Sequence, residues 1–149
     1  MTEKFTLQPL LELMQDRADE ATRRLGQLVS AEQDARKRLA LLTQYREEYL
    51  QRFREAQSGG LTPQAWRNFQ EFLDKLDLAI LQQTGLVETS AQNTVAGQEH
   101  WKVQNTKLKA IDTLSIRHQQ ALQKKEAKQE QKQLDEFAAR RFQVSNTES

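Results

Sequence analysis

Few side chains in this sequence have the types and spacing that catalysis requires. The two histidines, His100 and His118, are 18 positions apart, which on a helix separates them by roughly 27 Å. At that distance they share neither a metal ion nor a proton within one chain. Cysteine is absent, which excludes thiolate chemistry and disulfides. We therefore expect no metal site and interpret both histidines as solvated or partly packed.

Carboxylates and glycines do not form a catalytic pattern either. The acidic pairs Glu47-Glu48 and Asp135-Glu136 are expected on helix surfaces in water, where no desolvation would tune one carboxyl as an acid and the other as a base. The residues after Gly59-Gly60 lack the Lys-Ser/Thr pair that holds phosphates and Mg²⁺. We expect no catalytic residue and no cofactor, so the chain is predicted not to be an enzyme.

The composition favours long helices over a globular core. Of the 149 residues, 37% are hydrophobic and 29% charged, and only five glycines and two prolines punctuate the chain, so few turns are possible. No apolar run approaches the roughly 18 to 20 residues of a membrane span, and the start of the chain lacks a signal-peptide pattern. We expect a cytoplasmic protein whose net charge of +1 gives no overall attraction to nucleic acid or anionic lipid.

An apolar repeat of 3.5 residues runs through the first third of the chain. Only Glu32 and Arg46 interrupt it. Such a repeat is typical of a left-handed coiled coil, and it predicts a helix over about residues 7–57. The repeat positions are Leu11, Met14, Ala18, Ala21, Leu25, Leu28, Glu32, Ala35, Leu39, Leu42, Arg46, Tyr49, Phe53 and Ala56.

A short turn is predicted over residues 58–62. Glycine after a helix favours a C-cap and reversal, and Thr62 followed by Pro63 is typical of a helix start. The second helix is predicted over about residues 63–141, with a flexible tail over 142–149. Its repeat positions are Trp66, Phe69, Leu73, Leu76, Ile80, Gln83, Val87, Ser90, Thr94, Gly97, Trp101, Gln104, Leu108 and Ile111.

Reversal at the paired glycines makes the two repeats face each other. Phe53 is then predicted to meet Trp66, and Leu39 to meet Ile80. The polar middle of the second repeat, from Gln83 to Gly97, should be the weakest stretch. The prediction is an all-α, single-domain, long antiparallel two-helix coiled coil over residues 1–149, an α-helical hairpin. Its second helix overhangs from about Thr113.

The overhang is basic and ends in apolar residues. Seven lysines and arginines against four acids between Arg117 and Arg141 give a local charge of about +3, weaker than a DNA-reading region. A helix without a facing helix gains little from burial, so we expect this segment to become ordered on a partner. Its apolar residues are Leu134, Phe137, Ala138 and Phe142.

Aromatic residues cluster on both sides of the turn. Tyr49, Phe53, Trp66 and Phe69 follow the repeat, whereas Tyr45 and Phe72 are placed beside it, together with Leu42, Leu76 and Ala79. Apolar side chains outside a two-helix seam stay exposed, and such a surface is the usual mark of a protein interface. We interpret these residues as a candidate contact surface.

The same residues resemble those of the flagellar FliJ family. The pattern comprises Leu41-Leu42-x-x-Tyr45-x-x-x-Tyr49, a turn with glycine, Trp66-x-x-Phe69-x-x-Phe72-x-x-x-Leu76-x-x-Ala79-Ile80, and Asp135-Glu136-Phe137-Ala138. The resemblance covers nearly the whole chain. It implies a two-helix hairpin of the flagellar type III protein export apparatus that binds the hexameric export ATPase, the cytoplasmic part of the export gate and export chaperones.

The resemblance also implies site residues and a location. The gate-facing surface would comprise Leu42, Tyr45, Tyr49, Phe72, Leu76 and Ala79, whereas Arg38 and Gln83 depart from the family pattern, which favours Gln and His there. The surface for the ATPase ring would comprise Leu134, Phe137, Ala138 and Phe142. The implied location is the cytoplasm, peripheral to the inner membrane at the flagellar base through protein partners.

Three alternatives stay open from the residues. The equivalent stalk of a virulence-type secretion system would share the architecture. A basic helical nucleic-acid-binding protein would show binding that falls steeply with salt, although the weak local charge favours no nucleic-acid partner. An enzyme is the third alternative.

Overall fold

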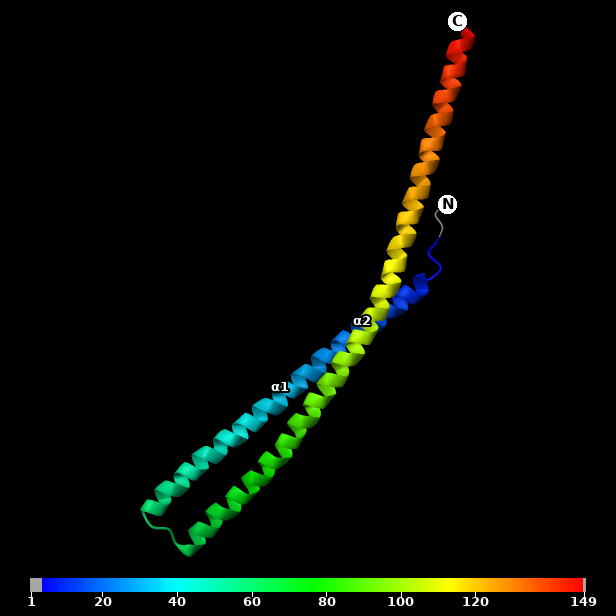
Figure 1. Ribbon diagram of the computed structural model, residues 1–149. Helices are drawn as coiled ribbons and strands as arrows, with labels where there is room; N and C mark the ends of the chain where they lie inside the picture. Colours follow the sequence, from blue (N-terminus) through cyan, green and yellow to red (C-terminus); the bar gives the residue numbers. More distant parts are fainter. Residues whose placement is uncertain (1–3, 149) are drawn as a thin grey trace. The chain divides into compact units, whose positions relative to one another are not determined.

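A computed structural model describes residues 4–148, with only the backbone described at Glu148. Helix α1 spans Gln8–Ser58 with 51 residues, and helix α2 spans Pro63–Glu148 with 86 residues. Figure 1 shows the two helices joined by one short turn. The helices pack against each other, and the described residues include no strand. The predicted all-α helical hairpin is therefore confirmed.

The turn has the predicted chemistry at both helix ends. The Thr62 Oγ1 accepts a hydrogen bond of 3.1 Å from the Ala65 N–H, which is an N-cap bond to the third residue beyond it. Gly60 has a φ of +87°, a left-handed conformation that glycine adopts without a side-chain clash. The Gly60 N–H donates to the Gln57 carbonyl at 3.1 Å, which closes the end of α1.

The far end of α2 differs from the sequence prediction. The sequence predicts a flexible tail over residues 142–149, but α2 continues to Glu148, and Ser149 lies outside the described residues. No glycine or proline follows Gly97 in the sequence. Since nothing removes a backbone donor or favours a left-handed residue there, the helix has no local reason to stop near Arg141.

Contacts divide the chain into two compact units. We name them the turn unit, Asp19–Val103, and the terminal unit, Met1–Ala18 with Gln104–Ser149. Each unit combines a part of α1 with a part of α2, and each is described by itself below.

In the turn unit the facing residues lie about three positions further along α2 than predicted. Phe53 contacts Phe69, with ring centroids 5.3 Å apart, whereas Trp66 is 47% exposed. The predicted pairing of Phe53 with Trp66 is therefore wrong. The reason is the turn: the chain reverses over the four residues between Ser58 and Pro63, so the midpoint of the hairpin lies after Gly60 and not between the two glycines.

Polar side chains bridge the helices along the seam of the turn unit. The buried Gln83 donates from Nε2 to the Ala35 carbonyl at 2.9 Å, and the Thr94 hydroxyl donates to the Leu28 carbonyl at 3.3 Å. Further along, the Trp101 indole N–H donates to the Thr22 hydroxyl at 2.9 Å. Because buried polar groups must be hydrogen-bonded, these bonds favour one alignment of the two helices.

Of the glycines in the turn unit, Gly97 is the one at which side chains of the facing helix come closest to the backbone. A Cβ atom at Gly97 would lie 2.6 Å from the Leu28 Cδ1 and 3.6 Å from the Leu25 Cδ1. The sequence predicts Leu28 across from Ala91 and Leu25 across from Thr94; in the structure both leucines lie beside Gly97. The missing side chain of the glycine makes room for both of them.

In the terminal unit the seam extends further along α2 than predicted. Ser115 is buried, and His118 and Leu122 are half-buried. The ring of His118 lies 5.4 Å from that of Phe5. The overhang therefore begins at Gln123 and not near Thr113, and every described side chain from Gln123 to Thr147 is exposed. The start is later because the facing residues are displaced in the same direction as in the turn unit and because Phe5, which precedes α1, packs on His118.

A bulky side chain at Gly97 should destabilise the protein. In Gly97→Leu the new side chain would overlap Leu28, so we expect a loss of about 1–3 kcal/mol in the free energy of unfolding. Gly85→Leu is the matched control, because Gly85 is on the exposed face of α2 with open space around its Cα, and leucine there should add up to about 1 kcal/mol through helix propensity. Urea unfolding followed by circular dichroism measures both. Equal effects would refute the close approach.

A carboxylate at position 83 should make stability depend on pH. In Gln83→Glu the ionised group cannot donate to the Ala35 carbonyl, so we expect a loss of about 1–3 kcal/mol at neutral pH. Burial raises the pKa of this carboxyl above its ordinary value of about 4.3. The loss should therefore shrink as the pH falls below the raised pKa and the protonated group donates again.

The control for this variant is its exposed neighbour. Gln82→Glu adds the same charge outside the seam, and the quantity to compare is the difference in unfolding free energy between the two variants at neutral and acidic pH. A difference that is absent at neutral pH, or that does not change with pH, would contradict the buried hydrogen bond.

Candidate protein-binding surfaces

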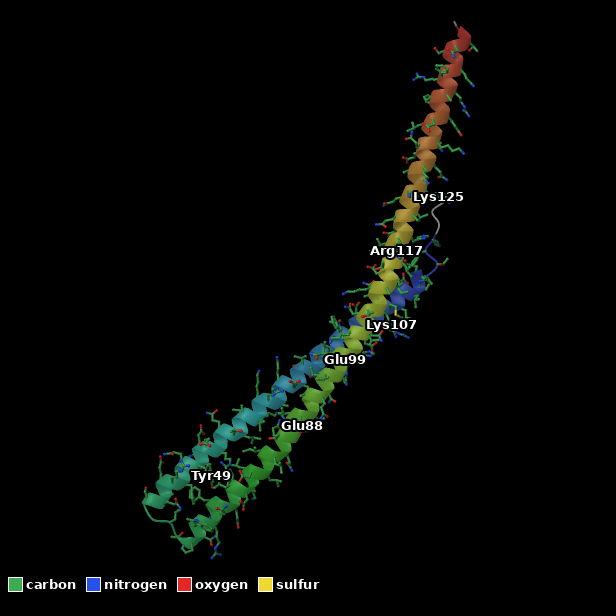
Figure 2. All side chains as sticks on the ribbon, viewed as in Figure 1. Tyr49, Glu88, Glu99, Lys107, Arg117 and Lys125 are labelled. Carbon is green, nitrogen blue, oxygen red and sulfur yellow. The ribbon has the colours of Figure 1, made fainter. Side chains whose placement is uncertain are left out.

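Four aromatic rings form a connected cluster near the turn, within the turn unit. Tyr49, from the last part of α1 (Figure 2), has its ring centroid 4.4 Å from that of Phe72 and 5.2 Å from that of Phe69. Phe69 also meets Phe53 at 62°, edge to face. Such tilted pairs contribute beyond the area they bury. This end of the hairpin is therefore held together by aromatic packing.

The six residues predicted to face an export gate are exposed to very different degrees. Tyr45 is 55% exposed and Phe72 38%. Tyr49, Leu42 and Ala79 are half-buried, and Leu76 is buried, with 8% of its surface exposed. The surface that a partner can reach therefore consists mainly of Tyr45, Phe72 and the exposed parts of the half-buried residues.

The sequence assigns two of these residues in two ways. Leu42 and Leu76 are both repeat positions and members of the group predicted beside the seam, and their burial agrees with the repeat, so both belong to the packed interface between α1 and α2. Leu76 holds the two helices together. A contribution of Leu76 to binding would come through the position of its neighbours.

Tyr45 and Phe72 occupy equivalent positions on the two helices. Each follows one repeat position by three residues and directly precedes the next, since Tyr45 lies between Leu42 and Arg46 as Phe72 lies between Phe69 and Leu73. In antiparallel helices, equivalent flanking positions lie on the same side of the seam. Both residues therefore lie on one edge of the hairpin, where the Tyr49 ring packs against Phe72.

The sequence interpretation missed Leu86 on the same edge. Phe72, Ala79 and Leu86 are spaced by seven residues, which places them in one row along a coiled-coil helix, and Leu86 is 56% exposed. The heptad spacing was the signal that could have identified it. We name the set Tyr45, Tyr49, Phe72, Ala79 and Leu86 the aromatic edge.

Arg46 interrupts the apolar repeat of α1 but has a partner on α2. Its Nε lies 2.6 Å from the Asp77 Oδ1. The hydrogen bond to Asp77, and then the charge of that carboxylate, raise the pKa of Arg46 above its ordinary value. The pair is solvent-exposed, so it contributes alignment of the helices more than stability.

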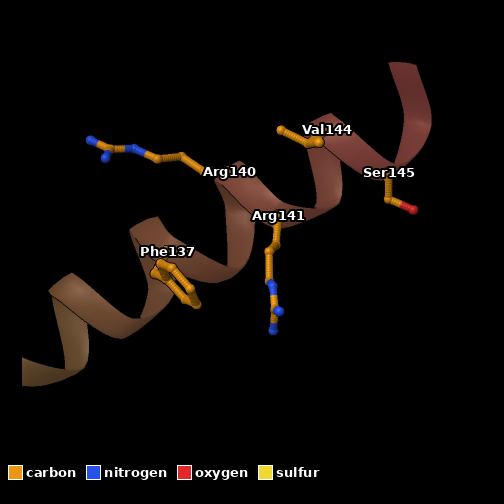
Figure 3. A pocket seen from close by; sticks show the side chains of 5 residues that line it. All are labelled: Phe137, Arg140, Arg141, Val144 and Ser145. Carbon is orange, nitrogen blue, oxygen red and sulfur yellow. The ribbon is translucent and has the colours of Figure 1, made fainter. Parts of the chain in front are cut away.

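A second apolar surface lies on the last turns of α2, in the terminal unit. Leu134, Phe137 and Phe142 are exposed, as predicted for a docking segment, and so is Ala138. Val144 is exposed as well, and the sequence interpretation did not include it. Phe137, Arg140, Arg141, Val144 and Ser145 line a shallow hollow (Figure 3).

The histidines and acids do not form a metal site in the part of the chain that the structure describes. No group of three or more His, Asp or Glu side chains there could hold a metal ion. His100 belongs to the turn unit and His118 to the terminal unit. Among residues 4–148, no helix is apolar over enough of its length to cross a membrane.

Comparisons with known proteins give matches along nearly the whole chain. The family model described as "Flagellar FliJ protein" matches residues 3–147. The flagellar FliJ protein of Escherichia coli strain K12 is 31% identical over 140 residues, which cover 94% of this chain and 95% of that protein. The FliJ protein of Salmonella typhi is 29% identical with the same coverage.

Among solved structures, a putative YscO homologue from Chlamydia trachomatis aligns over 99% of this chain and 100% of its own, at a TM-score of 0.43 and 17% identity. That likeness is too low to carry an argument. The family match and the two flagellar relatives do carry one: this chain belongs to the flagellar FliJ protein family.

Proposed function

We propose that this chain is a non-catalytic component of the flagellar type III protein export apparatus. In this proposal it is a stalk-like coiled coil that binds the hexameric export ATPase, contacts the cytoplasmic part of the export gate and interacts with export chaperones. It works in the cytoplasm, peripheral to the inner membrane at the flagellar base through its protein partners. Membership of the FliJ family over residues 3–147 is the observation that carries the proposal.

The aromatic edge is the proposed contact with the export gate. Tyr45 and Phe72 are exposed large side chains on one side of the seam, and the Tyr49 ring packs against Phe72 at 4.4 Å. Rings held by such packing lose little freedom on binding, and aromatic residues are enriched among those that dominate binding energy. The pairing of α1 with α2 therefore preorganises a surface to which both helices contribute.

The apolar residues near the end of α2 are the proposed contact with the ATPase ring. Leu134, Phe137, Ala138 and Phe142 lie in the segment from Gln123 to Thr147, where every described side chain is exposed. An exposed apolar stripe on a helix is favourable only if a partner covers it. A helix can present such a stripe to a groove of another protein.

A packed pair of helices suits a role in transmitting position. The seam of the turn unit holds its alignment by cross-helix hydrogen bonds at Gln83, Thr94 and Trp101. A displacement applied to one part of this seam can then be transmitted along it by the packed helices, with no chemical reaction in this chain. The family match to flagellar proteins favours the flagellar over the virulence-type assignment.

Alanine at the aromatic edge should weaken binding to the cytoplasmic domain of the export gate. We expect Tyr45→Ala and Phe72→Ala each to lower the affinity about tenfold or more, because exposed aromatic anchors dominate such contacts. Isothermal titration calorimetry measures the affinity, and circular dichroism should show unchanged helicity for both variants.

Leu41→Ala is the matched control for these two variants. Leu41 is 64% exposed but lies outside the aromatic edge, so the affinity should stay within about threefold of the unmodified chain. If Leu41→Ala weakens binding as much as Tyr45→Ala, or if helicity collapses in Tyr45→Ala, the proposed gate surface is wrong.

The export ATPase should respond to the end of α2. The purified chain alone is expected to hydrolyse no ATP, and addition of it to the purified export ATPase should raise the hydrolysis rate. The double variant Leu134→Ala with Phe142→Ala should abolish that stimulation. Leu81→Ala, which removes a 70% exposed leucine elsewhere on α2, should preserve it; stimulation that survives the double variant would exclude this surface.

A further inference from the structure

We infer that Arg141 is the specificity-determining residue of the surface at the end of α2, and that its partner must present a carboxylate beside an apolar groove. This inference rests on the proposed docking of that surface on the export ATPase. The inference goes beyond that docking by naming the chemical group, a carboxylate, that the ATPase would present to Arg141.

Arg141 lies within the apolar stripe of α2. It follows Leu134 by seven residues, Phe137 by four and Ala138 by three, and helix residues at these spacings share one face. The residues that flank it on the other side, at three and four positions, are Val144 and Ser145. A permanently charged side chain therefore sits among groups that would be covered on docking.

The Arg141 side chain is held against an aromatic ring. Its Cζ lies 5.6 Å from the centroid of the Phe137 ring, within the range of a cation–π contact. In Figure 3 the side chains of Phe137 and Arg141 extend to the same side of the helix, whereas Arg140 extends away from them. Both arginines line the hollow, but the contact with the Phe137 ring is made by the Arg141 guanidinium.

No carboxylate on α2 is placed to neutralise Arg141. None of the residues three or four positions before or after it is acidic, and Arg141 forms no ion pair among the ion pairs of the described residues. Arg140 differs, because Glu136 lies four positions before it, a spacing that permits a helix ion pair. Arg140 is also outside the ion pairs of the described residues, so the two arginines differ in that only Arg141 lacks an acidic residue at helix-pairing distance on α2.

Docking of the stripe would remove water from Arg141. A guanidinium does not lose its proton at any ordinary pH, so it stays charged when it is covered. An unpaired charge in an apolar contact opposes binding, whereas a carboxylate that accepts two parallel N–H bonds satisfies the planar fork. The surface that receives Phe137 must therefore place an Asp or Glu side chain where Arg141 arrives.

The test compares two adjacent arginines in the full-length chain. Affinity for the purified hexameric export ATPase is measured by biolayer interferometry for Arg141→Gln, Arg141→Lys, Arg140→Gln and Phe137→Ala. We expect Arg141→Gln and Phe137→Ala to weaken binding about tenfold or more, because a covered charge pair is lost in one and an anchor in the other. Arg140→Gln should change it less than about threefold, and Arg141→Lys should restore part of the affinity.

Salt dependence gives a readout that lost packing alone would not change. The fall of affinity with NaCl concentration should be flatter for Arg141→Gln than for the unmodified chain, because one charge pair is missing, whereas Phe137→Ala should keep the slope. Circular dichroism should show unchanged helicity in every variant, since these side chains are exposed.

The outcomes separate this inference from the proposed function. If Phe137→Ala weakens binding but Arg141→Gln behaves as Arg140→Gln does, the carboxylate inference is wrong and the docking surface stands. If neither Phe137→Ala nor Arg141→Gln weakens binding, the docking surface itself is wrong, and the role of Arg141 is excluded with it.

Discussion

A narrow apolar seam between α1 and α2 underlies the other features of this protein. Only about one side of each helix is apolar, and the buried apolar residues among those described are few: Met14, Ala18, Ala21, Leu73 and Leu76. Such a seam supplies modest burial per residue. Stability must therefore come from its length, and the hairpin turn keeps the two strips of residues in reach of each other.

A seam of this kind would tolerate several alignments if it were purely apolar. The polar groups inside it restrict the choice, because the Gln83 amide donates to the Ala35 carbonyl of the facing helix. The Thr94 hydroxyl lies within hydrogen-bond distance of the Leu28 carbonyl as well as of the Ser90 carbonyl of its own helix. Gly97 acts in the same direction by accepting Leu28 where a larger residue would clash. The polar centre is therefore a device for alignment, even though it lowers the apolar burial available there.

The seam also determines which apolar residues can reach a partner. Leu76 and Phe72 are four positions apart, yet the first is buried and the second exposed, because only one of them points into the seam. At the end of α2 no seam covers the stripe around Phe137, so the same residue types remain open to solvent. Figure 3 shows Arg141 and its neighbour Arg140 extending to different sides of the helix there.

The two helices, the turn between them and the buried face of each helix could be predicted from local sequence patterns. Proline and glycine at the turn act through local backbone preferences, and a repeat of 3.5 residues identifies a buried face without knowledge of the facing helix. Every repeat position of α1 from Leu11 to Ala56 is indeed buried or half-buried. These properties are local or periodic, so a single stretch of sequence contains them.

The alignment of α1 against α2, with its consequences for the seam and the overhang, came from the folded chain alone. The midpoint of the four-residue turn depends on how the backbone closes, and a shift of about three residues replaced Trp66 by Phe69 opposite Phe53. The covered seam extends to Leu122 and the overhang starts at Gln123, further than this shift alone would carry it, because Phe5, which precedes α1, packs on His118. Contacts between residues far apart in the chain set these features, and a heptad pattern repeats too regularly to distinguish neighbouring alignments.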